Sequence, residues 1–237
     1  MNLKAILLIA TNYLRTQRLT VVIMLVYFAG IAAVFFPNQR SQEARFFLQL
    51  HSFYVVFLAL IVAVPAIYAE RKSRRIVAVL SKGIDRWEYL AGILCGCVVI
   101  SGIFCALVGG ISFMLTFRGG YPLVGLGGLV LALFACALMA SAIGLFYGTF
   151  LHPLLATAGA SATLALPFLL KKAGLSLSDR FFPPSWMAES LSNFQFGEAA
   201  SNRDLAVVLG VAIGLTALFW IAAVVVFARR DVTISPE

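Results

Sequence analysis

Long hydrophobic runs and short polar segments follow each other along the chain. Five of the runs contain no Asp, Glu, Lys or Arg, and the longest covers residues 119–170. Because about 20 apolar residues cross a bilayer, the four shorter runs predict one membrane span each, and the longest must fold back on itself. Gly148 and Pro153 indicate the fold-back point, since Gly frees the backbone and Pro ends a helix. The pattern therefore predicts six spans, at residues 19–39, 46–69, 89–117, 121–147, 153–170 and 205–228.

The hydrophobic runs are continuous and lack the apolar–polar alternation of a transmembrane strand. A helix satisfies its backbone hydrogen bonds internally, as a span inside a bilayer requires. Composition agrees, because 62% of the residues are hydrophobic and 12% are charged, whereas a soluble domain is roughly 45–50% apolar. We therefore expect an all-α membrane protein, with residues 1–237 forming a single transmembrane domain.

Basic residues are distributed unevenly between the two sides of the membrane. With six spans both termini share one side, and residues 1–18, 70–88 and 229–237 on that side hold 11 of the 18 Lys and Arg residues. The positive-inside rule places that side in the cytoplasm. We therefore expect a multi-pass protein of the cytoplasmic (inner) membrane with both termini in the cytoplasm. Topology explains the net charge of +8, so nucleic-acid binding need not be invoked.

Several function classes lack the residues that they need. The predicted spans contain no Asp, Glu, Lys or Arg, which disfavours a carrier driven by an ion gradient. An intramembrane serine protease could use Ser161, but the two histidines, His51 and His152, sit near helix ends, and the sixth span has none to activate that serine. The chain also has no G-x-x-x-x-G-K-[ST] phosphate loop. We therefore expect no catalytic site here, and ATP hydrolysis in a separate subunit.

All four cysteines lie inside predicted spans. Cys95 and Cys97 could contribute to a soft-metal site, but they point to different faces of a helix and have no His or Met partners nearby. Free cysteines usually pack as small buried hydrophobic side chains. Packing is therefore the favoured role, and we expect no bound metal.

Residues 70–88, between the second and third spans, carry six of the Lys and Arg residues. Gly83 breaks a first helix in this hairpin, and Asp85 is a suitable N-cap for the helix that enters the third span. Two interpretations are open: a basic loop that meets anionic lipid and fixes topology, or a folded hairpin whose exposed apolar stripe is a docking surface. The stripe consists of Ile76, Val77, Val79, Leu80 and Ile84.

This hairpin resembles the cytoplasmic loop of ABC-2 type transporter permeases. The residues that carry the resemblance are Leu80, Ser81, Ile84, Arg86, Tyr89, Leu90 and Gly92. Arg74 and Arg75 stand where the family usually has Gly-Thr. In that family the loop is a coupling helix that docks on a separate ATPase subunit, and we expect Ile84, Arg86 and Trp87 to enter the ATPase groove. The implied coupling residues are Arg74, Arg75, Leu80, Ser81, Lys82, Gly83, Ile84, Asp85, Arg86, Trp87 and Tyr89.

The first 18 residues have the pattern of a helix that lies in the membrane interface. Leu3, Ile6, Leu7, Ala10 and Leu14 share one face, opposite Asn12, Arg15 and Arg18. This segment resembles the N-terminal elbow helix of the same family, which implies elbow residues at Lys4, Tyr13, Arg15 and Arg18. The resemblance also implies that the fold-back turn is a second coupling contact, through Gly148, Thr149 and His152.

Residues 171–204 form an outer segment that is longer than passive connections usually are. Its aromatic residues surround Pro183 and Pro184, as suits a short helix among lipid headgroups. A loop with an aromatic anchor is the alternative. Similar family members dip helices back into the outer leaflet here, which implies a re-entrant or interfacial outer gate at Phe182, Pro183, Pro184, Trp186 and Met187.

The resemblance implies that the chain is the membrane-spanning permease subunit of an ATP-driven ABC exporter. Its partners would be a second permease chain, in a homodimer or heterodimer, and two copies of an ATPase subunit that binds ATP and Mg. The chain itself would bind no cofactor, and its substrate would be lipidic, hydrophobic or peptidic. Two alternatives are the substrate-binding membrane subunit of an ABC-type vitamin importer and a non-transporting membrane scaffold.

Overall fold

The computed structural model describes residues 2–35, 41–72, 76, 79, 83–118, 125–173, 183–194 and 200–229. Within these residues the regular elements are seven α-helices with no strand, which confirms the all-α prediction. The helices are α1 (Leu3–Phe35), α2 (Ser41–Lys72), α4 (Arg86–Arg118), α5 (Leu126–Gly148), α6 (Pro153–Lys172), α7 (Pro183–Phe194) and α8 (Asn202–Arg229).

Four helices are long and apolar enough to cross a membrane, so the chain is a multi-pass membrane protein. The remaining two predicted spans, at residues 19–39 and 153–170, overlap α1 and α6. In α6 the described apolar segment, Pro153–Leu166, is shorter than the other four, and the number of six spans stays a prediction. The four membrane-crossing segments are Leu48–Lys72, Arg86–Met114, Leu126–Gly148 and Asn202–Arg229.

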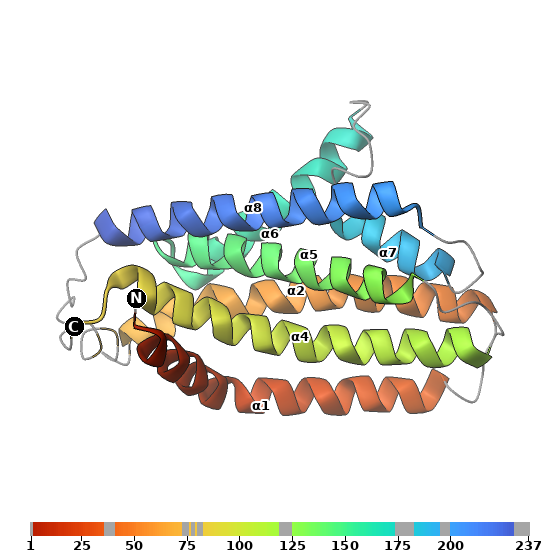
Figure 1. The fold of residues 1–237 in the computed structure, drawn as a ribbon, viewed down its shortest axis with the longest axis horizontal. Helices are drawn as coiled ribbons and strands as arrows, with labels where there is room; N and C mark the ends of the chain where they lie inside the picture. Colours follow the sequence, from red (N-terminus) through yellow and green to blue (C-terminus); the bar gives the residue numbers. More distant parts are fainter. Residues whose placement is uncertain are drawn as a thin grey trace.

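Helices α2, α4, α5 and α8 lie lengthwise beside one another (Figure 1), with α5 at the centre, packed against α2, α4, α6, α7 and α8. The N-terminal ends of α1 and α4 lie at one end of this bundle, together with the C-terminal ends of α2, α5 and α8. We call this the basic end, because it carries Arg71, Lys72, Arg86 and Arg229. Helix α7 lies toward the opposite end.

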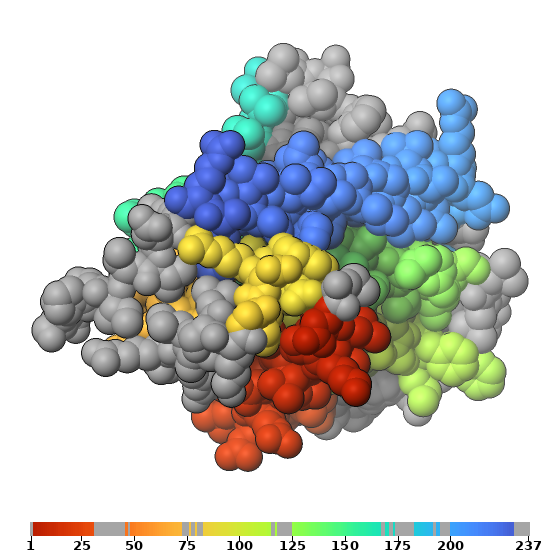
Figure 2. Space-filling view, turned by 60° about the vertical axis from the view of Figure 1, so that its left-hand side comes forward, coloured from red at the N-terminus to blue at the C-terminus, as the bar shows by residue number. Residues whose placement is uncertain are grey.

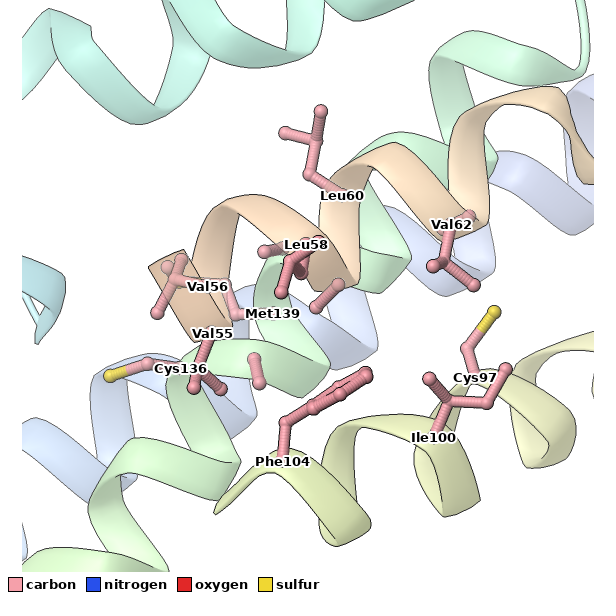
Figure 3. Packing of buried hydrophobic residues seen from close by; sticks show 14 of the residues in the cluster. Val55, Val56, Leu58, Leu60, Val62, Cys97, Ile100, Phe104, Cys136 and Met139 are labelled. Carbon is pink, nitrogen blue, oxygen red and sulfur yellow. The ribbon is translucent and has the colours of Figure 1, made fainter. Parts of the chain in front are cut away.

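The core lies mainly between α2, α4 and α5. Figure 3 shows Val55 of α2 close to Cys136 and Met139 of α5, with Ile100 and Phe104 of α4 beside them. All five side chains are at most 3% exposed. Because lipid tails are as apolar as these side chains, close packing rather than exclusion of water holds such helices together.

Two glycines of α5 allow that helix to approach the backbone of α2 closely. A Cβ at Gly148 would lie 2.6 Å from the carbonyl oxygen of Val64, and a Cβ at Gly144 would lie 3.1 Å from the carbonyl oxygen of Leu60. Any side chain at Gly148 would therefore push the two backbones apart. Gly144 and Gly148 thus form a packing seam between α5 and α2.

A second glycine seam joins α4 to α1. A Cβ at Gly92 would lie 2.7 Å from the Cβ of Ile9, and a Cβ at Gly96 would lie 2.5 Å from the Cδ1 of Tyr13. The N-terminal part of α1 therefore packs directly on the first turns of α4. Gly110, further along α4, makes no such contact, because a Cβ there would meet nothing within 4 Å.

The predicted fold-back point is confirmed. Helix α5 ends at Gly148 and α6 begins at Pro153. Thr149 follows α5 in a helical conformation, and its N–H donates to the carbonyl of Leu145 at 3.0 Å. The four residues between the two helices reverse the chain at the basic end.

Helix α1 joins two segments that the sequence separates. The segment expected at residues 1–18 and the first part of the span expected at residues 19–39 belong to one helix, Leu3–Phe35. Figure 1 shows that its N-terminal part runs at an angle to the rest of α1. In Figure 2 this N-terminal part, in dark red, lies beside the yellow start of α4 on the surface of the molecule.

Candidate functional site

The break and restart predicted in the hairpin are present. Gly83 has a φ of 77°, a conformation that favours glycine because it has no Cβ. Helix α4 then begins at Arg86, and the carbonyl of Asp85 accepts a hydrogen bond from the N–H of Tyr89 at 3.0 Å. Gly83 and Asp85 are exposed and Trp87 is partly exposed. These residues form a turn at the basic end whose surface is accessible.

The residues of the apolar stripe that the structure describes are not exposed as predicted. Ile76 is fully buried in the main hydrophobic core, and Val79 and Ile84 are partly buried against that core. The expectation of an exposed stripe is wrong at Ile76, because its side chain joins the protein's own core. The other stripe residue Val77 lies outside the described residues, as do the predicted coupling residues Arg74, Arg75, Leu80, Ser81 and Lys82.

Arg86 links the start of α4 to the end of α8. Its guanidinium donates to the carbonyl oxygens of Phe227 at 3.0 Å and Ala228 at 2.9 Å. The last carbonyls of a helix have no partner within the helix and attract a cation. The buried ring of Tyr89 also stacks on Phe227, with 6.4 Å between ring centroids. Sequence reasoning missed this role of Arg86, because its partners are 141 and 142 residues away.

Glu88 links the same turn of α4 to the start of α1. The side chain is 5% exposed, and its carboxylate accepts a hydrogen bond from the backbone N–H of Asn2. The Oδ1 of Asn2 in turn accepts from the N–H of Ala5 at 3.3 Å, which caps the first turn of α1. The first turn of α4 therefore contacts the ends of two other helices, through Arg86 and Glu88.

The fold-back turn is held by the end of α2. The Arg71 guanidinium donates to the carbonyl of Thr149 at 2.8 Å, and the ring of Tyr68 lies edge-on to His152, with centroids 5.3 Å apart. Thr149 is buried, whereas His152 is exposed. Of the three residues predicted for a second coupling contact, Gly148 and Thr149 therefore pack inside the protein and His152 presents its side chain at the surface.

Of the predicted elbow residues, Tyr13 is buried, whereas Lys4, Arg15 and Arg18 are exposed. The phenol of Tyr13 donates to the carbonyl of Val62 in α2 at 2.7 Å. This carbonyl lies one turn before Pro65, which interrupts the backbone hydrogen bonds of α2 because it has no N–H. Burial raises the pKa of Tyr13 well above its ordinary value of 10.0, so the phenol stays a hydrogen-bond donor at neutral pH.

The predicted outer segment contains a short helix, α7, which starts at Pro183. Of the predicted gate residues, Pro183 and Met187 are buried, Pro184 and Trp186 are partly buried, and Phe182 lies outside the described residues. Helix α7 packs mainly against α2 and α5. The gate residues therefore cover one end of the bundle, on the side away from the hairpin.

A cavity of about 730 Å³ lies between α2, α5, α6, α7 and α8. Sequence reasoning did not predict it. The aromatic residues Phe53, Tyr54 and Phe57 line one wall, but their spacing along α2 is equally typical of a lipid-facing surface. A hydrophobicity pattern alone does not distinguish a cavity wall from a face that meets lipid.

His51 lies in an aromatic cluster between α1 and α2. The sequence places it near a helix end, but α2 begins at Ser41, so His51 is inside the helix and 2% exposed. Its ring centroid lies 6.2 Å from Tyr27, 5.4 Å from Phe28 and 5.8 Å from Tyr54. Ser161 lines the cavity, whereas the three rings beside His51 belong to α1 and α2.

Cys95 is exposed and Cys97 is buried, so the two cysteines do point to different faces of α4. The Sγ of Cys97 lies 3.8 Å from the hydroxyl of Tyr13. Across the described residues, His, Cys, Asp and Glu form no group of three that could hold a metal ion.

No protein-family model matches the chain, and no curated protein matches its sequence. The resemblance of the hairpin to ABC-2 type permeases therefore stays an expectation from the sequence.

Proposed function

We propose that the chain is the permease subunit of an ATP-driven ABC exporter of the ABC-2 type, working with a second permease chain and two ATPase subunits. One observation carries the proposal: the first turn of α4, directly after the hairpin, contacts both the C-terminal end of α8 and the N-terminal end of α1. Arg86 makes the first contact and Glu88 the second.

This geometry suits the transmission of a movement from a cytoplasmic partner. A partner that binds the exposed turn around Gly83, Asp85 and Trp87 would displace the start of α4. Because Arg86 and Glu88 connect that start to α8 and α1, the three helices would move together. ATP binding closes the ATPase pair, and the movement of the turn converts that closure into a change between inward-open and outward-open states.

The partner subunits, and not this chain, would bind and hydrolyse ATP. The chain has no phosphate loop, so ATP and Mg would bind the ATPase subunits. With the basic end in the cytoplasm, the hairpin and the fold-back turn face the ATPases, whereas α7 and its gate residues face the other side of the membrane.

The test uses the partly exposed Trp87, because aromatic side chains carry a large share of interface energy. The chain is co-expressed with each ABC ATPase subunit of its source cell, and co-purification and ATP hydrolysis of the complex are measured. We expect Trp87→Ala to lower both by at least about tenfold, since an interface aromatic contributes roughly 2 kcal/mol. Phe117→Ala is the control, because it also removes an aromatic side chain, which is 65% exposed and lies at the other end of α4.

Arg86 is left unchanged in this test, because it binds α8 and its loss would alter the fold as well as the docking surface. If wild-type chain and ATPase co-purify and Trp87→Ala co-purifies equally well, the turn is not the docking surface. If no ATPase of the source cell binds the wild-type chain, the exporter proposal fails.

A further inference from the structure

The cavity between α2, α5, α6, α7 and α8 has the size of a ligand site. Its volume of about 730 Å³ falls within the roughly 300–1,000 Å³ of small-molecule pockets. It is lined from five helices, including Met139 and Ile143 of α5 and Leu215 and Phe219 of α8. The space is open at the surface, and its volume is large enough to take a small molecule or part of a lipid.

The lining is apolar and uncharged. None of its residues is Asp, Glu, Lys, Arg or His, and its hydroxyl groups belong to Tyr54, Ser161, Thr163 and Ser185. The Thr163 hydroxyl is engaged within the protein, since it lies 2.8 Å from the hydroxyl of Tyr147 and donates to the carbonyl of Gly159 at 2.9 Å. An ionic or strongly hydrated molecule would lose its water here without compensation.

The cavity opens on the lipid-facing surface. Phe53, Tyr54 and Phe57 line it and yet remain 43%, 38% and 43% exposed. Helix α6, which forms another wall, exposes Leu155 and Leu166 by 62% and 52%. In a multi-pass membrane protein, apolar side chains exposed along a spanning helix face lipid. A molecule can therefore enter from the bilayer without passing through water.

One end of the cavity is formed by the start of α7. Pro183, Pro184 and Ser185 line it there, at the end of the bundle away from the hairpin. Interfacial segments of this kind lie at headgroup level. A molecule with a polar group near α7 and an apolar chain directed into the bundle would match both the lining and the opening.

We propose that this cavity binds one acyl chain of a lipid that the permease transports. The proposal rests on the proposed export function and adds the class of substrate. The chain enters sideways between α6 and α2, packs against the aromatic residues of α2 and the aliphatic residues of α5 and α8, and leaves the headgroup beside the start of α7. Ser185 contributes a hydroxyl group from α7 to the cavity wall, where the headgroup would lie.

The first experiment fills the cavity and measures lipid binding. Purified chain is reconstituted in phosphatidylethanolamine vesicles that contain a few per cent of the same lipid with a diazirine in one acyl chain, then irradiated and mapped by mass spectrometry. We expect cross-links on the cavity residues of α5 and α8 to fall at least about fivefold in Ala165→Phe. Ala158→Phe is the matched control, because Ala158 is an exposed alanine of α6 outside the cavity lining.

A second pair of variants on another helix keeps the test decisive if α6 does not tolerate the first change. Leu215→Trp fills the cavity from α8, and Leu218→Trp places the same side chain on a position of α8 that is 59% exposed. We expect Leu215→Trp to reduce the same cross-links and Leu218→Trp to leave them unchanged. Wild-type cross-linking in both Ala165→Phe and Leu215→Trp would overturn the proposal.

A third measurement separates a transported lipid from a lipid that is only part of the bilayer. ATP hydrolysis by the complex with its ATPase is measured with and without the vesicle lipid, because a transported molecule stimulates the turnover that moves it. We expect stimulation in wild type and Ala158→Phe, and its loss in Ala165→Phe. Equal stimulation in all three, with cross-linking lost in Ala165→Phe, would show an ordinary bilayer lipid and overturn the substrate assignment.

The two proposals can fail separately. If no ATPase binds the chain but the cavity variants lose the cross-links, the acyl-chain site stands and the export function does not. If the Trp87 test succeeds but the cavity variants keep the cross-links, the export function stands and the lipid substrate does not.

Discussion

The two ends of the bundle are built differently. At the basic end, polar side chains join the helices: Arg71 holds the turn after α5, Arg86 holds the end of α8, and Glu88 holds the start of α1. Toward the opposite end, α6 and α7 line an apolar cavity, although α6 also contacts α5, where the hydroxyls of Tyr147 and Thr163 lie 2.8 Å apart. The difference teaches that hydrogen bonds to helix ends connect α1, α4 and α8 at the basic end, whereas apolar side chains around an open space line the other part of the bundle.

Helices α5 and α6, which the fold-back turn connects, show a similar contrast. α5 contacts the backbone of α2 at Gly144 and Gly148, whereas α6 exposes Leu154 and Leu155 by 77% and 62%. Both helices meet at the fold-back turn, whose Thr149 carbonyl is bound by Arg71. The turn is therefore held from α2, and α6 leaves it with apolar side chains on its outer face.

The largest effect should come from separating α5 and α2. We expect Gly148→Leu to lower the free energy of unfolding by about 3 kcal/mol or more, because overpacking against a backbone carbonyl has no flexible side chain to absorb it. Thermal unfolding in detergent micelles measures the change. Gly110→Leu is the control, because a Cβ there meets nothing within 4 Å. Equal losses in the two variants would mean that the close contact of α5 with α2 is unimportant.

The next effect tests the connection between α4 and α8. We expect Arg86→Ala to cost about 2 kcal/mol, since hydrogen bonds from a charged group are worth roughly 1.5–3 kcal/mol. Compared with wild type, backbone hydrogen exchange should also become faster in the last turn of α8, whereas the rate in its first turn should stay the same. Arg203→Ala, an exposed arginine at the start of α8, is the control. Unchanged exchange at the end of α8 would contradict a mechanical link through Arg86.

Removal of one hydroxyl tests the connection between α1 and α2. We expect Tyr13→Phe to lower the free energy of unfolding by about 1 kcal/mol, because the Val62 carbonyl loses its donor. Tyr27→Phe is the control on the same helix, since Tyr27 is 41% exposed. Thermal unfolding at neutral pH measures both. A larger cost for Tyr27→Phe would mean that the N-terminal part of α1 is not held by Tyr13.

The same variant should change the response to alkaline pH. The pKa of Tyr13 is higher in the folded than in the unfolded chain because the phenol is buried. Its contribution to stability is therefore complete below the ordinary value of 10.0 and is lost as the pH rises above that value toward the folded pKa. We expect wild type to lose more stability than Tyr13→Phe above that pH, as measured by unfolding across an alkaline series.

The smallest effect should be at the cavity. We expect Ala165→Phe to change the free energy of unfolding by less than about 0.5 kcal/mol, as is usual for a position with room around it. The same thermal measurement that detects Gly148→Leu serves here. A loss as large as that of Gly148→Leu would mean that α6 packs as tightly as α5, and the contrast between the two helices would be wrong.

Local signals in the sequence predicted much of the fold. The hydrophobic runs predicted the long helices because a bilayer imposes their length, and Gly83 and the Gly148–Pro153 turn predicted where helices stop because glycine and proline act on their own backbone. The glycine seams of α4 and α5 follow a general pattern, since small residues four positions apart allow another helix to approach closely.

The site was less predictable, because its contacts depend on which helices are neighbours. Arg86 has the charge and position of a docking residue, but its partner is the end of α8, 141 residues later. Ile76 belongs to an apolar stripe, but nothing local tells whether such a stripe meets a partner or the protein's own core. The cavity leaves no pattern at all, since its walls have the same composition as surfaces that face lipid.

The packing of Tyr13 also has a consequence for the order in which the chain is assembled. Its hydroxyl binds Val62, 49 residues later, and lies 3.8 Å from Cys97, 84 residues later. At roughly 5–20 residues per second, synthesis needs about 4–17 seconds to supply those 84 residues. Until then the start of α1 lacks its main packing partner, the α4 surface that carries Gly92 and Gly96. The amphipathic pattern that suits an interface is thus useful during synthesis, before α4 exists.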